Sequence, residues 1–468
     1  MKTYDAIVIG SGPGGYPCAI RLGQLKQKTL CIEKDKPGGV CLNWGCIPSK
    51  ALIHASHQFE KATEGAEVGV KVGDVSFDVD AMQDWKDGIV TKLNKGVRAL
   101  LKGAGVDYQA GAAKLTGPDT VEVTGSDGST ETFRAEKGIV IATGAAPINL
   151  PTFKPDGTRI IGAKEALSLR AVPKRLMVIG GGAIGVELGT VYQKLGSELT
   201  LVEALPDLLT GVDSQCVRLV ERKIKKHGGK ILKKTFAKGY EQKADGSLEV
   251  TLDKGGDLQT VNVDVVLVAI GMRSSTAELG LESAAVALDE RGFVTIDERG
   301  RTNVETIYAI GDVTGPPLLA HRASTQGEAV AEIIAGHDVT IDLSVMAAVV
   351  FSDPEIAGVG LTEQSAKDQE MDVKIGKFPF MALGKAMAMR ETDGFVKIIA
   401  DAKTDRVLGV HIVGPEAGAM ISEAALTIKL GATTADVADT IHPHPTLGEA
   451  YMEAAANALG RAIHIPNR

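Results

Sequence analysis

Two stretches with the same design decide the fold. Residues 4–15 read YDAIVIGSGPGG, and residues 175–185 read RLMVIGGGAIG. Each is a short apolar strand pattern that runs into glycines spaced G-x-G-x-x-G, followed by a helical pattern and a second strand pattern that ends in an acid. The glycines are Gly10, Gly12 and Gly15 in the first copy and Gly180, Gly182 and Gly185 in the second. The acids are Glu33 and Glu203, each 23 residues beyond the first glycine of its copy.

This spacing has a physical reason in dinucleotide binding. The first glycine permits a tight turn, the second lets backbone N–H groups reach a pyrophosphate, and the third lets helix and strand pack closely. The helix N-terminus favours phosphate, and the acid bonds the ribose hydroxyls. One copy alone would be weak evidence, because glycine-rich turns also occur in ordinary α/β sheets. Two copies in the same context predict an α/β fold with two Rossmann-like dinucleotide-binding domains.

The acid of the second copy indicates which nucleotide binds there. A carboxylate at Glu203 repels the 2′-phosphate of NADP, which is usually met by an arginine. No arginine occurs between residues 199 and 210. We therefore expect the second domain to bind NAD.

Three further apolar runs end at a glycine, as parallel strands do where they meet a ligand crevice. They are residues 138–144, 265–271 and 307–312. Their ends supply Thr143, Gly144 and Gly271 as candidate cofactor contacts. Asp312 is a candidate partner for a cofactor hydroxyl; its alternative role is a helix cap or turn residue.

Length and composition agree with a globular protein of several domains. The 468 residues suggest about three domains. Glycine is in excess, with 55 residues against an average usage of roughly 7%. The net charge of −8 and the lack of a basic block argue against nucleic-acid binding. No apolar stretch approaches the length of a membrane span, and the first apolar run is too short for a signal peptide. We expect no membrane contact and a cytoplasmic location, the alternative being an organelle lumen reached with a presequence since removed.

The order of the patterns predicts the domain organisation. Residues 1–148 hold the first dinucleotide unit, and residues 149–276 hold the second. Residues 277–346 return to the first domain. Residues 347–468 lack a glycine fingerprint and mix strand patterns with a long amphipathic helix near 420–429, which predicts an α+β domain.

One cysteine pair stands in a position suited to redox chemistry. Cys41 and Cys46 lie in GGVCLNWGCIPSK, residues 38–50, shortly after Glu33. Pro48 fits the first turn of a helix, so Cys46 is expected at a helix N-terminus, where a thiolate is stabilised. The alternatives are two structural thiols or half of a metal site. No second Cys/His pair with ligand spacing appears, so we expect no metal. The remaining cysteines, expected in the core, are Cys18, Cys31 and Cys216.

A histidine motif near the C-terminus is the candidate acid/base. Residues 442–449 read HPHPTLGE, with prolines on both sides of His444. Glu449 is placed to bond one ring nitrogen and fix the tautomer, as general acid/base histidines require. The alternative is a proline-rich turn with surface histidines.

Residues 38–52, 180–189, 309–313 and 442–449 together resemble the flavoprotein disulfide reductases, and among them the dihydrolipoamide dehydrogenases, along nearly the whole chain. The resemblance implies FAD in the first domain, NAD in the second, and a homodimer whose last domain is the interface. The FAD contacts that it implies are Gly10, Gly12, Gly15, Glu33, Lys50, Ala113, Thr143, Gly144, Asp312, Leu318, Leu319, Ala320 and His321. Those implied for NAD are Gly180, Gly182, Ile184, Gly185, Glu187, Glu203, Ala237 and Gly271.

The resemblance also implies a reaction. Catalysis would use a Cys41–Cys46 disulfide and the pair of His444 and Glu449, with the histidine serving the partner subunit. Dihydrolipoyl groups on the lipoyl domains of 2-oxoacid dehydrogenase or glycine cleavage complexes would be oxidised and NAD⁺ reduced.

Three alternatives stay open beside this reading. A glutathione-type reductase would prefer NADPH. Mercuric and large thioredoxin reductases carry C-terminal thiols, whereas no cysteine follows Cys216 here. A non-catalytic flavin-bearing subunit of a complex is the third.

Overall fold

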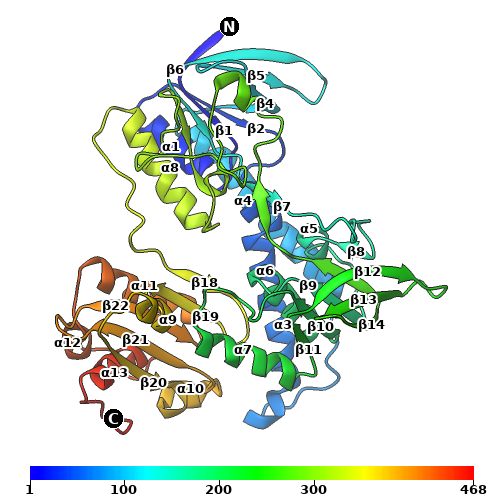
Figure 1. The fold of residues 1–468 in the computed structure, drawn as a ribbon, viewed down its shortest axis with the longest axis vertical. Helices are drawn as coiled ribbons and strands as arrows, with labels where there is room; N and C mark the ends of the chain where they lie inside the picture. Colours follow the sequence, from blue (N-terminus) through cyan, green and yellow to red (C-terminus); the bar gives the residue numbers. More distant parts are fainter. Residues whose placement is uncertain (468) are drawn as a thin grey trace.

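The first glycine motif lies at the centre of a mixed sheet. The computed structural model describes residues 1–467, and this sheet forms the upper part of Figure 1. In spatial order its strands are β3 (Asp107–Ala110), β2 (Thr29–Glu33), β1 (Lys2–Ile9), β6 (Thr130–Ile141), β5 (Thr120–Thr124) and β4 (Ala112–Leu115), with β17 (Ile307–Ala309) also paired to β6. Strand β1 is parallel to both β2 and β6. Residues 307–309 thus return to the first domain.

Helices cover this sheet because the apolar residues of β1 are buried on both faces. Ala6, Ile7 and Val8 are fully buried. Helix α1 (Gly15–Gln24) packs against α8 (Ala320–Ile334), and the long α4 (Val79–Gly103) adds a further contact. Pro17 lies in the first turn of α1, where a missing N–H is tolerated. The expected core cysteines Cys18, Cys31 and Cys216 are all fully buried.

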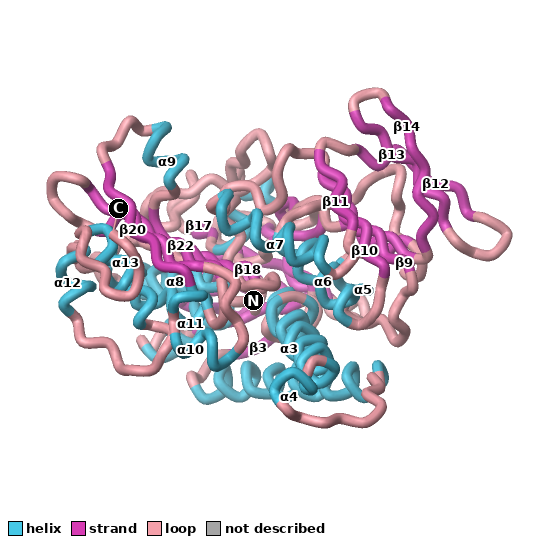
Figure 2. Tube along the Cα trace, turned by 90° about the horizontal axis from the view of Figure 1, so that it is seen from below, coloured by secondary structure: helices cyan, strands magenta, loops and turns pink. Residues whose placement is uncertain are grey.

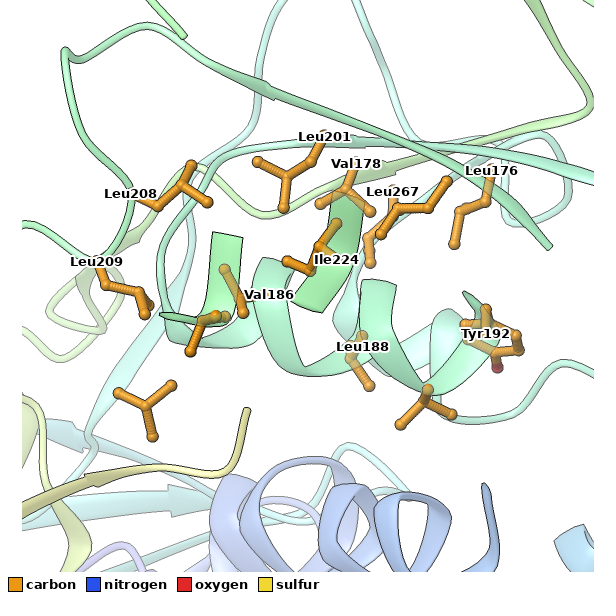
Figure 3. Close-up of a cluster of buried hydrophobic side chains, with 14 of the residues drawn as sticks. Leu176, Val178, Val186, Leu188, Tyr192, Leu201, Leu208, Leu209, Ile224 and Leu267 are labelled. Atoms are coloured by element: carbon orange, nitrogen blue, oxygen red, sulfur yellow. The ribbon is translucent and has the colours of Figure 1, made fainter. Parts of the chain in front are cut away.

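The second glycine motif lies in a separate parallel sheet. Its strands, in order, are β11 (Lys230–Lys233), β10 (Glu198–Glu203), β9 (Arg175–Ile179), β15 (Val265–Val268) and β8 (Ile160–Ile161). Helices α6 (Ala183–Lys194) and α7 (Ser214–Lys226) bury apolar side chains against it, as Figure 3 shows for Val178, Val186 and Leu201. A short α5 (Ala163–Ala166) and the antiparallel sheet β12 (Phe236–Gln242), β13 (Leu248–Lys254) and β14 (Asp257–Val263) complete this part.

A two-stranded ribbon carries the chain out of the first sheet and back. Strand β7 (Ala145–Pro147) pairs antiparallel with β16 (Met272–Ser274). On either side of the ribbon, Ile148 N–H donates to Gly271 O at 3.0 Å and Ser275 N–H donates to Gly144 O at 3.0 Å. The two segments that connect the first and second domains therefore lie side by side. For this reason we propose the domain limits at residues 148 and 276.

The C-terminal part is an antiparallel sheet covered by helices. Its strands, in order, are β18 (Ala348–Val350), β19 (Ile356–Gly360), β22 (Val407–Val413), β21 (Phe395–Asp401) and β20 (Val373–Pro379). Its helices are α9 (Glu363–Asp368), α10 (Gly384–Met389), α11 (Ala417–Lys429), α12 (Thr434–Asp439) and α13 (Glu449–Ala458). Figure 2 shows this sheet on the opposite side of the molecule from β12–β14. The expected fold class, two Rossmann-like domains and an α+β domain, is confirmed.

No helix among residues 1–467 is long and apolar enough to cross a lipid bilayer.

A buried ion cluster joins the second and third parts. Lys397 on β21 is fully buried, and its Nζ lies 2.8 Å from Asp213 Oδ2 and 2.5 Å from Glu363 Oε1. Asp213 caps α7, because its carboxylate accepts the Gln215 N–H at 2.9 Å. Burial acts to raise the pKa of Asp213, but the hydrogen bond and charge of Lys397 outweigh it and hold that pKa below its usual value.

We expect Lys397→Met to destabilise the protein by about 3–5 kcal/mol, because the buried carboxylate of Asp213 and the partly buried one of Glu363 then lose their cation. The measurement is the urea midpoint of unfolding at pH 7, with Lys367→Met on the exposed face of α9 as the control. Equal midpoints for the two variants would contradict the assigned role of the cluster.

Candidate functional site

Both glycine motifs form the turn that the sequence predicts. Gly10 and Gly180 have φ values of 101° and 112°, which favour glycine. A Cβ on Gly15 would lie 1.8 Å from Gly10 O, and one on Gly185 would lie 2.1 Å from Gly180 O. The third glycine of each motif is therefore required for the helix to pack against the turn.

The middle glycines leave room for a ligand. A Cβ on Gly182 would meet no described atom within 4 Å, and one on Gly12 would meet only Gly39 Cα, at 3.8 Å. Such open space beside the N-terminus of α1 and of α6 is what a pyrophosphate needs. Ile184, in the first turn of α6, is exposed beside the second motif.

The two acids hold their turns in the same way. Glu33 Oε2 accepts the Ser11 N–H at 2.8 Å, and Glu203 Oε2 accepts the Gly181 N–H at 2.6 Å. The other oxygen of each accepts an N–H two residues further along the chain. A carboxylate has about four acceptor positions, so each acid keeps capacity for a ribose hydroxyl.

Ala113 and Ala237 occupy matching places in the two domains. Gly111 N–H donates to Glu33 O at 2.9 Å, and Thr235 N–H donates to Glu203 O at 3.0 Å. Each alanine follows that contact by two residues and lies on the strand that leaves it, β4 or β12. This equivalence supports both residues as contacts on the nucleoside side.

Cys41 and Cys46 form a disulfide, with their Cα atoms 4.6 Å apart. Cys41 lies in α2 (Gly39–Trp44), and Cys46 is the first residue of α3 (Cys46–Thr63). Gly38 N–H donates to Ser11 O at 2.9 Å. A Cβ on Gly39 would lie 2.6 Å from Gly12 Cα, so only glycine allows this approach. The disulfide is thereby delivered to the first glycine turn.

A buried asparagine that sequence reasoning missed also positions the disulfide. The side-chain amide of Asn43 donates to Pro37 O at 3.0 Å and to Gly39 O at 2.9 Å, and Asn94 on α4 bonds its oxygen. These bonds fix the segment between β2 and α2. Its place between Cys41 and Cys46 is the one sequence signal that could have pointed to it.

Lys50 and Glu187 meet where three parts of the chain join. Lys50 Nζ lies 2.8 Å from Glu187 Oε2, and its ammonium lies 4.3 Å from the ring centroid of Phe351. The other Glu187 oxygen accepts the Phe351 N–H at 2.9 Å. Lys50 belongs to α3, the helix that begins at Cys46, so its charge is fixed one turn from the disulfide. Phe351 was missed by sequence reasoning, because it lies 164 residues from Glu187.

The return segment, which holds Asp312, packs against the first glycine turn. Asp312 lies in the short helix 311–314. The pKa of its carboxyl is raised, because the effect of burial exceeds the opposing effect of the Arg322 charge. Helix α8 packs on the turn, since the Ser324 hydroxyl donates to Pro13 O at 2.8 Å. The segment Leu318, Leu319, Ala320 and His321 leads into α8, with Leu319 as its N-cap. His321 Nε2 lies 2.8 Å from Ala347 O.

Two candidate cofactor contacts, Thr143 and Gly144, form hydrogen bonds beside the β7–β16 ribbon. The Thr143 hydroxyl donates to Ser275 O at 2.9 Å, and Gly144 accepts the Ser275 N–H. Gly271 has a φ of 122° and lies between the end of β15 and the start of β16. All three lie at the carboxyl ends of strands, where a cofactor crevice is expected.

His444 and Glu449 are paired as the sequence predicts. His444 Nδ1 lies 2.8 Å from Glu449 Oε1, and Thr446 N–H donates to Glu449 Oε2 at 2.8 Å. The His444 side chain is 79% exposed, whereas that of Glu449 is 15% exposed. Burial acts to raise the pKa of Glu449, but the bonds from Thr446 and His444 outweigh it and lower that pKa. The carboxylate bonds Nδ1, so Nε2 makes no contact with Glu449.

Comparison with known proteins defines the class. The pyridine nucleotide-disulphide oxidoreductase family matches residues 4–327, and the dimerisation domain of that family matches residues 346–455. The chain belongs to the pyridine nucleotide-disulphide oxidoreductases. The resemblance found in the sequence is confirmed.

Two similar proteins of the family are dihydrolipoyl dehydrogenases. The dihydrolipoyl dehydrogenase of Thermus scotoductus is 47% identical over 471 residues, covering all of both chains. That of Geobacillus stearothermophilus is 46% identical over 98% of this chain and 97% of its own length. A crystal structure of LpdA from Mycobacterium tuberculosis superposes with a TM-score of 0.90 at 28% identity, covering 97% of this chain and 99% of that one.

Proposed function

We propose that this protein is a dihydrolipoyl dehydrogenase, which oxidises protein-bound dihydrolipoyl groups and passes the electrons to NAD⁺. The observation that carries the proposal is the Cys41–Cys46 disulfide held against the first glycine turn. The full-length similarity to dihydrolipoyl dehydrogenases supports the choice of substrate.

The open glycine turns and the partly buried Asp312 fit two dinucleotide cofactors. FAD would lie on Gly10, Gly12 and Gly15, with Glu33, Ala113, Asp312 and the 318–321 segment around it. NAD⁺ would lie on Gly180, Gly182 and Gly185, with Ile184, Glu203 and Ala237. When bound, FAD and NAD⁺ supply the two-electron chemistry that carries reducing equivalents from the dithiol to NADH.

The sulfur steps use the protein's own side chains. His444 Nε2 takes the proton of one substrate thiol, and the resulting thiolate attacks Cys41 Sγ. The Cys41–Cys46 bond breaks, and Cys46 leaves as a thiolate that the N-terminus of α3 stabilises. The second substrate thiol then attacks its own partner sulfur in the mixed disulfide, its proton passes to the departing Cys41 sulfur, and the cyclic lipoyl disulfide is released. Substrate is oxidised by two electrons, and the enzyme disulfide is reduced to a dithiol.

The base is supplied by the second subunit of a homodimer. Helix α13, which begins at Glu449, lies on the side of the C-terminal part that faces away from α3 (Figures 1 and 2). His444 of one subunit would therefore serve the disulfide of its partner. The dimerisation domain match supports the dimer. So do exposed apolar side chains on the C-terminal part, namely Met381, Leu426, Leu430, Ile441 and Ile463.

Lipoyl domains of 2-oxoacid dehydrogenase or glycine cleavage complexes are the proposed partners. A flexible lipoyl arm suits a thiol site reached from the surface between two subunits. The cytoplasm is the proposed location, because sparse, mostly buried thiols are typical of reducing compartments.

The test is to mix the purified protein, loaded with FAD, with dihydrolipoamide and NAD⁺ and to follow NADH. We expect NADH formation with NAD⁺ and little with NADP⁺, because Glu203 stands where a 2′-phosphate would lie. The control replaces dihydrolipoamide with reduced glutathione. No NADH from dihydrolipoamide, or NADPH as the better product, would overturn the proposal.

A further inference from the structure

A second histidine lies beside the proposed base and is bonded on both sides. The His442 side chain is only 5% exposed. Its Nδ1 lies 2.8 Å from Thr440 O, and its Nε2 lies 3.0 Å from Glu423 Oε1. Both partners are acceptors, and a neutral imidazole carries only one N–H. The two contacts are satisfied together only by the imidazolium form of His442.

These bonds fix the loop that carries His444. Glu423 belongs to α11, whereas the loop of residues 440–448 connects α12 to α13. The His442 bond ties the start of the loop to α11, and the bond from Thr446 N–H to Glu449 ties its end to α13. A Cβ on Gly448 would lie 3.6 Å from His442 Cδ2, so the ring also packs against the N-cap of α13.

The charges around His442 come from α11 and α13. The hydrogen bond that His442 donates to Glu423 raises the pKa of His442 against the effect of burial, and the charges of Glu423 and Glu449 add to this. Burial keeps Tyr451 on α13 neutral by raising its pKa. On the C-terminal tail His464 bonds Glu453 at 2.7 Å, and its charge acts on Glu449. The pair of His442 and Glu423 thus adds no net charge beside His444.

We propose that His442 is a positioning residue for the thiol reaction: bonded to Glu423, it fixes the loop of the base and offsets the charge of Glu423 on the neighbouring α11. This inference rests on the proposed function. Removing the cation alone leaves Glu423 as an uncompensated negative charge, which favours protonated His444. A protonated His444 cannot accept the substrate proton.

The test is the pH profile of kcat/KM for dihydrolipoamide in His442→Gln, Glu423→Gln and the double variant. In His442→Gln we expect the acid limb to lie about half a pH unit higher, which is about threefold less activity on that side. Glu423→Gln and the double variant should keep the limb of the unmodified protein, because neither leaves an unpaired carboxylate. His337→Gln is the matched control, since His337 also pairs with a glutamate, Glu332, but far along the chain from the loop. The proposal would be overturned if His442→Gln lowered kcat/KM equally at all pH values and the double variant did not restore it.

A second measurement does not depend on activity. Because the folded-state pKa of His442 lies above its usual value, the bond stabilises the protein below about pH 6.5 and is lost as pH rises through the folded pKa. The thermal midpoint of His442→Gln should therefore fall furthest below that of the unmodified protein near pH 6 and least near pH 9. A pH-independent difference would overturn the charged pair. If the protein does not oxidise dihydrolipoamide at all but this stability pattern is present, the proposed function fails and the His442 bond stands.

Discussion

Replacing either cysteine of the disulfide, in Cys46→Ser or in Cys41→Ser, should reduce dihydrolipoamide-dependent NADH formation to background. Thiol–disulfide exchange needs one sulfur to be attacked and a second to leave, so neither variant retains a route through the other cysteine. The assay is NADH formation with the FAD-loaded variants. Cys216→Ala is the control, because Cys216 is buried in α7 and takes no part in the exchange. Substantial turnover in either active-site variant would remove the disulfide from the mechanism.

The two single-thiol proteins also separate the roles of the sulfurs. Cys46, the sole thiol of the pair in Cys41→Ser, lies at the N-terminus of the eighteen-residue helix α3. Cys41, the one left in Cys46→Ser, lies within the six-residue α2. The helix dipole favours the Cys46 thiolate, so alkylation by iodoacetamide should reach half its maximal rate at a lower pH in Cys41→Ser. The reverse order would exchange the assigned roles of attacked and leaving sulfur.

How much of this site the sequence predicts depends on chain separation. The glycine turns, the acids and the disulfide are each encoded within about 25 residues, because one strand–turn–helix unit or one loop builds them. The pair of His444 and Glu449 is local for the same reason. By contrast, the bonds that join Lys50 to Glu187 and Glu187 to Phe351 span 137 and 164 residues. Only the packing of the three parts brings these residues together, and no periodic pattern in the sequence predicts such contacts.

The fold follows the same rule. Apolar runs that end at glycine predict the parallel strands β1, β9 and β15, because a strand that is buried on both faces needs a continuous run of apolar residues. The buried cluster of Lys397, Asp213 and Glu363 could not be predicted, since a lysine in a strand pattern is ordinarily expected to face solvent. Its buried position follows from where α7 and α9 meet β21.

His444→Gln should slow dihydrolipoamide oxidation by about 10²–10⁴-fold, the usual range for loss of a general base. Glutamine keeps a polar group in the loop but cannot take the thiol proton. The control reaction is oxidation of NADH by ferricyanide, which needs no thiol deprotonation and should be little changed. Equal losses in both reactions would mean that the variant has lost its cofactors or its dimer instead of its base.

Glu449→Gln tests how the base is held. The carboxylate accepts two N–H bonds, from His444 Nδ1 and from Thr446 N. An amide can accept only one of them, so its NH₂ group must face either the Thr446 N–H or the imidazole. If it faces the imidazole, Nδ1 must accept and the proton moves to Nε2, where the base should be free. We therefore expect Glu449→Gln to lose more activity at neutral pH than Glu449→Ala, which leaves both tautomers open. A larger loss in Glu449→Ala would mean that the carboxylate acts by orienting the ring, not by selecting its tautomer.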